Sequence, residues 1–212
     1  VAPGRAIEAE CLAWKGALEL RLQDFTSAVD LFQQALEIYD RVDPVGFETS
    51  TVLLWLGECQ ARIGDLAASR RSFLRALSIR EEIEADPLEV AGCLSSVGVV
   101  EFFAGNLDAA QGYFERAVHI QEEFGDDPVT LAQTLINLGN VSVERWRFDL
   151  ARERYEEALA LLEQHAPTHD ARGKAVGNLG EMCRRQGDYD AAESYSKREM
   201  AFFEEHFPDS LE

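Results

Sequence analysis

Five glycines recur at a constant spacing of 41 residues along this 212-residue chain: Gly16, Gly57, Gly98, Gly139 and Gly180. Around each glycine lies the same pattern, two stretches of helical hydrophobic periodicity with a short break between them. A fixed period of this length is typical of a helical solenoid, in which each repeat packs only on its neighbours. The period therefore predicts an all-α solenoid, although length alone would suggest one or two globular domains.

We predict five antiparallel helix pairs, because no β-type alternation lasts for more than a few residues. The helices are expected at 4–22 and 25–40, 46–63 and 66–83, 88–104 and 107–123, 129–145 and 148–164, and 170–186 and 189–206. The chain, 1–212, is then a single solenoid with repeats at 3–41, 44–83, 87–124, 128–165 and 167–206, and 207–212 begins a further repeat.

Asp-Pro dipeptides precede three of the predicted helices, at Asp43-Pro44, Asp86-Pro87 and Asp127-Pro128. An Asp side chain accepts hydrogen bonds from the free N–H groups at a helix start, and Pro suits the first helical position. Each dipeptide is therefore expected to begin a helix.

The turn within each pair is marked by Gly64-Asp65, Gly105-Asn106 and Gly187-Asp188, because Gly readily adopts the left-handed conformation that ends a helix. Gln23-Asp24 and Trp146-Arg147 stand at this point in the first and fourth repeats. Since a positive φ is unfavourable for Trp, we expect a different turn at Trp146.

The second helix of each repeat has a small residue and an aromatic residue at two fixed positions. The small position holds Ala28, Ser69, Ala110, Ala151 and Ala192, and the position four residues later holds Phe32, Phe73, Phe114, Tyr155 and, as an exception, Ser196. Small residues let helices approach closely and the aromatic ring fills the remaining space, so the five periodic glycines should lie at buried helix crossings.

Leu94, Val97 and Gly98, followed by Ala110, Phe114 and Ala117, resemble the tetratricopeptide repeat. The long period is similar to the variety found in kinesin light chains and in many bacterial signalling and regulatory proteins. The resemblance implies a right-handed superhelix in which the first helix of each pair lines a concave groove. It also implies that Asn residues in the column of Asn137 and Asn178 bond the backbone of a bound peptide.

The formal charge of −19 is spread over all five repeats. A net negative field repels phosphate groups, so we expect no nucleic-acid partner and no membrane, and a mild preference for basic partners. No apolar run approaches the roughly 20 residues of a membrane span. The four cysteines, Cys11, Cys59, Cys93 and Cys183, form no CxxC pair and are interpreted as buried apolar residues of a cytoplasmic protein. Because Val is the first residue, the chain is expected to be a fragment or a processed product.

Enzymatic chemistry is not indicated by any motif. The sequence has no P-loop and no GxSxG, and isolated glycines at helix crossings do not supply the consecutive N–H groups of a phosphate loop. Only His165 and His169 lie close together, and Pro167 between them disrupts a shared helix face. We therefore predict no enzyme, no cofactor and no metal.

Partner binding is the function that the groove positions favour. The predicted contact residues are Trp55, Phe102, Phe103, Asn137, Asn140, Lys174, Asn178, Arg184 and Arg185. A carboxamide both donates and accepts hydrogen bonds, so it can bind an extended main chain. The alternatives are that the Asn side chains are merely solvated and that Trp14 and Trp55 pack between repeats.

We therefore predict a non-enzymatic scaffold that binds a peptide segment or a protein partner in its concave groove. The alternative is a sensor module of a larger signalling protein with a kinase, ATPase or transcription regulator. The last predicted helix carries Phe202 and Phe203, so we also expect either a longer protein or self-association through the C-terminal face.

Overall fold

The computed structural model describes residues 3–125 and 127–208, and the regular structure in these ranges is helical, without strands. The helices are α1 (Pro3–Arg21), α2 (Phe25–Val42), α3 (Phe47–Arg62), α4 (Leu66–Glu82), α5 (Pro87–Phe103), α6 (Leu107–Phe124), α7 (Pro128–Glu144), α8 (Phe148–His165), α9 (Asp170–Gln186) and α10 (Tyr189–His206). Their ends lie within about two residues of those that the periodicity predicts. The predicted all-α repeat fold is confirmed.

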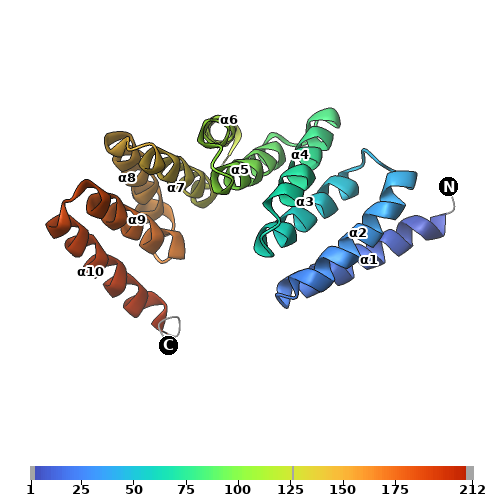
Figure 1. Ribbon diagram of the computed structural model, residues 1–212, viewed down its shortest axis with the longest axis horizontal. Coiled ribbons are helices and arrows are strands. Elements are labelled where there is room, and N and C mark those ends of the chain that lie inside the picture. Colours follow the sequence, from blue (N-terminus) through green and yellow to red (C-terminus); the bar gives the residue numbers. More distant parts are fainter. Residues whose placement is uncertain (1–2, 126, 209–212) are drawn as a thin grey trace. The chain divides into compact units, whose positions relative to one another are not determined.

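The chain divides into two compact units, Val1–Asn106 and Leu107–Glu212. In the first unit, α1 packs on α2, α2 on α3, α3 on α4 and α4 on α5 (Figure 1). In the second unit, α6 packs on α7, α7 on α8, α8 on α9 and α9 on α10. Within each unit, short turns join consecutive helices, so neighbouring helices run antiparallel. The right-handed superhelical path stays a prediction, and residues 209–212 of the predicted further repeat lie outside the described part of the chain.

The turn between α7 and α8 differs from the prediction. Trp146 has a φ of 58°, in the same left-handed region as Gly187 at 84°. Its N–H donates to the Val143 carbonyl at 2.9 Å, and the Arg147 N–H donates to the Ser142 carbonyl at 2.9 Å, the bonds that close a helix end. The expectation of a different turn is therefore wrong, because the close packing of α7 on α8 outweighs a local cost of about 1–2 kcal/mol.

Two of the three Asp-Pro dipeptides cap helices as predicted. Asp86 accepts from the Leu88 N–H at 2.9 Å, and Asp127 accepts from the Val129 N–H at 3.0 Å. The prediction for Asp43 is wrong, since α3 begins only at Phe47 and Asp43 ends α2 instead. The Asp43 carbonyl accepts from the Thr49 hydroxyl at 2.6 Å, and this bond closes a turn ahead of α3.

The five periodic glycines are all buried, as predicted. A Cβ atom added to Gly57 would lie 2.7 Å from the Phe73 ring, and one added to Gly16 would lie 2.6 Å from the Phe32 ring. Ordinary contacts begin at about 3.4 Å, so these crossings admit no side chain larger than hydrogen without a rearrangement.

The cysteines do not all follow the prediction of burial. Cys59, Cys93 and Cys183 are buried, whereas Cys11 is exposed. Burial raises the pKa of the Cys59 and Cys93 thiols to about 11, which makes these thiols unreactive at neutral pH. Cys11 differs because it lies on a face of α1 that no preceding repeat covers among the described residues.

Candidate binding groove

A groove of about 1150 Å³ lies within the first unit, over α3 and α5. Side chains from α2, α3, α4 and α5 line it, and most of them are apolar. The apolar lining consists of Phe25, Leu54, Trp55, Ala61, Leu66, Phe73, Val99, Val100 and Phe103. A concave, largely apolar site with a few polar groups is the form that binding sites commonly take.

The groove exists because α5 has a small residue at a position where the two preceding repeats have tryptophan. Ser96 stands at the repeat position that Trp14 and Trp55 occupy on α1 and α3. One turn before it, Gly92 has no atom within 4 Å of the place where its Cβ would lie. Because Ser96 has no indole ring and Gly92 has no side chain, open space remains beside Trp55.

Trp55 forms one wall of the groove and is held by its neighbours. Its ring centroid lies 5.8 Å from that of Phe32 and 6.2 Å from that of Trp14. Trp55 therefore packs between repeats, which is the alternative that the sequence left open, and it still presents part of its surface to the groove.

Phe103 also lines the groove and is 68% exposed. Phe102 contacts the Phe103 ring edge-on with centroids 5.5 Å apart, and is half-buried. Phe102 does not itself line the groove. The structure thus brings Trp55 and Phe103 to one site, and Phe102 contacts this site only through Phe103.

Charged side chains stand at two places in the groove. At one place the guanidinium of Arg62 lies 5.2 Å from the centroid of the Phe25 ring, and Glu58 stands one helical turn before Arg62 on α3. These two groups can contact the polar parts of a ligand whose apolar side chain enters the groove.

At the second place Arg80 is only 4% exposed and joins three helices. Its Nε donates to Ser50 at 2.5 Å, its Nη2 donates to Thr51 at 2.8 Å, and its Nη1 lies 2.6 Å from Glu89 Oε2. The guanidinium also stacks on the Phe47 ring at 3.7 Å. The sequence analysis did not single out Arg80, because its column holds Tyr39, Gln121 and Leu162 in other repeats.

The predicted asparagines lie in the second unit. Asn140 Oδ1 accepts from the Tyr155 hydroxyl at 2.7 Å and from Asn178 Nδ2 at 3.2 Å, so this amide joins α7, α8 and α9. Asn137 is half-buried, and its side chain makes no hydrogen bond to any residue that the structure describes. Among the predicted asparagines, the Asn140 Nδ2 group, the Asn178 Oδ1 atom and the whole Asn137 amide are thus left for a ligand.

The predicted basic residues of the second unit are paired with carboxylates. Lys174 lies 2.6 Å from Asp170, Arg184 lies 2.6 Å from Glu181, and Arg185 lies 2.8 Å from Glu144. The hydrogen bond from Lys174 lowers the pKa of Asp170, and that from Arg184 lowers the pKa of Glu181. These pairs reduce the attraction of the three basic side chains for an acidic ligand.

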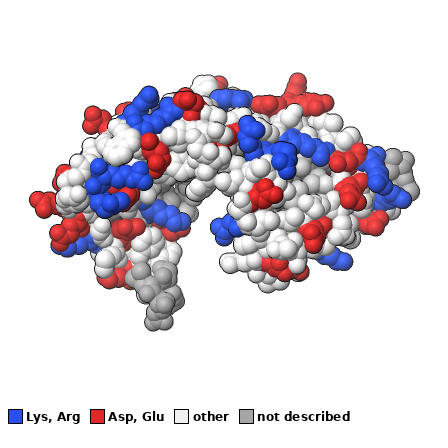
Figure 2. Space-filling model, in the orientation of Figure 1, with Lys and Arg blue, Asp and Glu red and all other residues white. Residues whose placement is uncertain are grey.

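Other kinds of site are not found in the described part of the chain. Residues 3–125 and 127–208 contain no group of three or more His, Cys, Asp or Glu side chains able to hold a metal ion. None of their helices is long and apolar enough to cross a membrane. On the face shown in Figure 2, basic side chains are interspersed with acidic ones.

The sequence profile of the tetratricopeptide repeat matches residues 8–82, 89–164 and 130–205. No curated protein matches the sequence. Among solved structures, BtubC (BKLC) from P. vanneervenii is similar with a TM-score of 0.77 and 21% identity, over 93% of this chain and 80% of that one.

Two Rap proteins are also similar in structure. Apo RapI matches with a TM-score of 0.83 and 19% identity, over 93% of this chain and 71% of that one. The Rap conjugation gene regulator of plasmid pLS20, in complex with the Phr* peptide, matches with a TM-score of 0.72 and 18% identity, over 94% of this chain and 54% of that one. At these identities the likeness shows the fold.

Proposed function

Because the chain belongs to the tetratricopeptide repeat family, we propose that it is a non-catalytic scaffold that binds a peptide segment of a partner in the groove of its first unit. The observation that carries the proposal is the open, apolar space beside Trp55, where Ser96 stands in place of a tryptophan and Gly92 has no side chain. A similar fold holds a peptide in the pLS20 Rap regulator, which supports a peptide as the ligand here.

The lining defines the chemistry of the ligand. An aromatic or branched aliphatic side chain would bury its surface against Trp55, Val99 and Phe103, with a gain of about 1.5–3 kcal/mol. Glu58 and Arg62 would contact the polar groups next to that anchor. The net charge of −19 favours basic residues at the flanks of the peptide.

The proposal is tested by placing a tryptophan at position 96, where its indole ring should fill the groove. A displayed library of random linear peptides is selected on the chain, and the affinity of an enriched peptide is measured by fluorescence anisotropy. Ser96→Trp should weaken binding by at least about tenfold, which corresponds to 1.4 kcal/mol. Trp occupies this repeat position at Trp14 and Trp55, so the variant should keep its thermal stability.

Ser96→Ala is the matched control, because the Ser96 hydroxyl donates to the Gly92 carbonyl of its own helix, at 3.0 Å, and to no other described residue. Binding to this variant should stay within about twofold of that to the parent chain, since no ligand contact is lost. Unchanged affinity for Ser96→Trp, or enriched peptides without an apolar anchor, would contradict the proposed site.

A further inference from the structure

Helix α1 exposes a face that the first helices of the later repeats bury. Cys11 and Leu18 lie on this face, and Leu18 is 56% exposed. One repeat later, the same positions on α3 hold Val52 and Cys59, which are 1% and 0% exposed. The apolar character of these positions is retained on α1, but its cover is missing.

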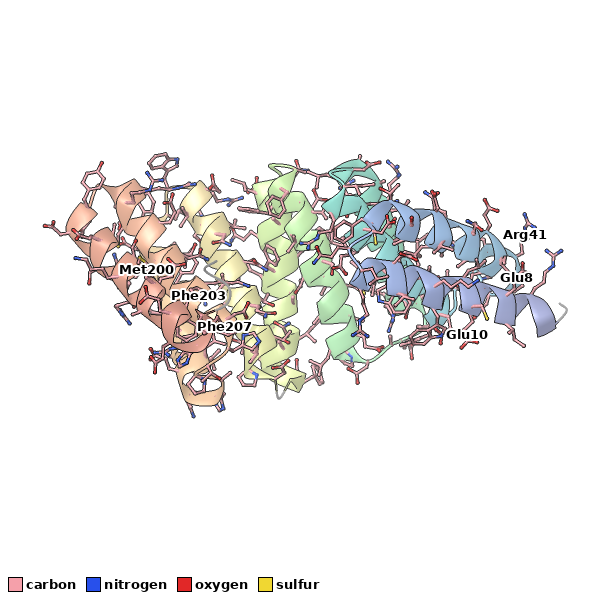
Figure 3. The ribbon with its side chains drawn as sticks, turned by 90° about the horizontal axis from the view of Figure 1, so that it is seen from below. Glu8, Glu10, Arg41, Met200, Phe203 and Phe207 are labelled. Carbon is pink, nitrogen blue, oxygen red and sulfur yellow. The ribbon has the colours of Figure 1, made fainter. Side chains whose placement is uncertain are left out.

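Helix α10 exposes the complementary face. Met200 is 59% exposed, whereas Leu36, Leu77 and Val118 at the same repeat position are 7%, 5% and 8% exposed. Met200 and Phe203 lie on α10 and Phe207 directly follows its last residue, as labelled in Figure 3. Phe203 and Phe207 are half-buried. An exposed Met on this face is adaptable and can fill an irregular contact.

The two faces correspond to the two sides of an interface that exists inside the first unit. There α2 packs on α3, and Leu36 of α2 belongs to the same apolar cluster as Val52 and Cys59 of α3. Met200 is the equivalent of Leu36, and the pair Cys11 and Leu18 is the equivalent of Val52 and Cys59.

A pair of opposite charges distinguishes the two exposed faces from the internal interface. Lys15 on α1 replaces an apolar residue that is buried in every later repeat, as Leu56 is on α3. Glu199 on α10 replaces an alanine that is fully buried in every earlier repeat, as Ala35 is on α2. Ala35 and Leu56 belong to one apolar cluster, so the counterparts of Lys15 and Glu199 share a core within the first unit.

Neither charge has a partner among the residues that the structure describes. Lys15 is exposed, and Glu199 is half-buried against Gly177 of α9 without an ion pair. Burial also raises the pKa of the Glu199 carboxyl, since nothing offsets the loss of water around it. A cation brought to this carboxylate would therefore stabilise it.

We propose that the chain self-associates head to tail, with α1 of one copy docking on α10 of a second copy as α3 docks on α2. Lys15 then pairs with Glu199 across the contact, and Cys11 and Leu18 cover Met200. Because the two surfaces differ, the contact is heterologous, and each copy keeps one face of each kind for a further copy. This contact is separate from the groove and does not depend on the proposed peptide binding.

Charge reversal in a mixture tests the proposal. Lys15→Glu places two carboxylates at the contact, and Glu199→Lys places two ammonium groups there, so each variant alone should self-associate at least about tenfold more weakly than the parent chain. In an equimolar mixture every contact between the two variants joins opposite charges again, and sedimentation velocity should show assembly restored. No defect in folding of a single variant can produce this rescue.

Glu37→Lys on α2 is the control, because Glu37 is exposed and the variant changes the net charge as Glu199→Lys does. It should assemble like the parent chain. The Cys11 thiol gives a second measurement, since its alkylation rate should fall as the chain concentration rises from micromolar to millimolar. A chain that stays monomeric over that range, or two variants that assemble separately as well as they do together, would overturn the proposal.

Discussion

Replacing Gly57 by Ala tests how strongly the helix crossings depend on a missing side chain. The new Cβ would lie 2.7, 2.8 and 3.0 Å from three atoms of the Phe73 ring, which is 6% exposed. Contacts need about 3.4 Å, so the nearly buried ring must move by roughly 0.7 Å, at a cost of about 1–3 kcal/mol. The helix propensity of Ala returns about 1 kcal/mol. We expect a net loss of about 1 kcal/mol.

Gly180→Ala is the matched comparison. Its Cβ would lie 3.2 Å from Tyr195 Cβ and 3.5 Å from the Ala192 carbonyl oxygen, because Ser196 has replaced the aromatic ring. This crossing is looser, so the gain in helix propensity should dominate and stabilise the chain by about 0.5 kcal/mol.

Urea unfolding followed by far-UV circular dichroism measures both variants, and the difference between them should be about 1.5 kcal/mol. Gly57→Ala combined with Phe73→Leu should lose less than the sum of the two single losses, since the smaller side chain removes the overlap. Equal effects of the two Gly→Ala changes, or strict additivity in the double variant, would refute the reasoning.

Three further outcomes follow from the turns, the amide contacts and the caps. Trp146→Gly should raise stability by about 1 kcal/mol in thermal unfolding, because Gly adopts the positive φ without strain; a loss would show that the Trp146–Phe148 ring contact matters more. Asn140→Ala should lower stability by about 1–3 kcal/mol, because the hydroxyl of Tyr155, a residue only 1% exposed, then loses its acceptor. Asn137→Ala should be neutral in the same measurement. The hydrogen bond from the Thr130 side chain, with further bonds from backbone N–H groups, lowers the pKa of the Asp127 carboxyl. The contribution of Asp127 to the free energy of unfolding is therefore complete above the unfolded pKa of about 3.9, and it is lost as the pH falls through the lower folded pKa. Asp127→Asn should therefore lose less stability than the parent chain on acidification below about pH 4, as measured by urea unfolding across that range.

The sequence predicts the helices of this protein well because the signals for each helix boundary recur in all five repeats. A glycine such as Gly57 and its equivalents define the phase, and the hydrophobic pattern then places the helix ends. What the local pattern cannot weigh is tertiary packing. Trp146 takes a positive φ and Asp43 fails to start a helix, although the local chemistry of each residue favours the opposite outcome.

The groove could be predicted only in part. The columns point to Trp55 and Phe103, and the substitution of Ser96 for Trp is visible in the sequence. That this substitution leaves a void depends on Gly92 and on the direction of Trp55, which only the packed helices define. Partners that are distant in the sequence, such as Arg80 and Ser50, likewise cannot be predicted from spacing, since Arg80 is not repeated in its column.

The left-handed turns also bear on the order in which the helix pairs form. Hairpins that close on Gly64 or Gly187 reverse the chain without conformational strain, whereas those that close on Gln23 or Trp146 begin with a deficit of about 1–2 kcal/mol. In a repeat protein, folding can nucleate at any repeat and propagate to the next one. The deficit makes nucleation at α1–α2 or α7–α8 rarer by a factor of roughly 5–30. We therefore expect α3–α4 to form first in its unit and to template α1–α2, so that substitutions at Gln23 change the unfolding rate more than the folding rate.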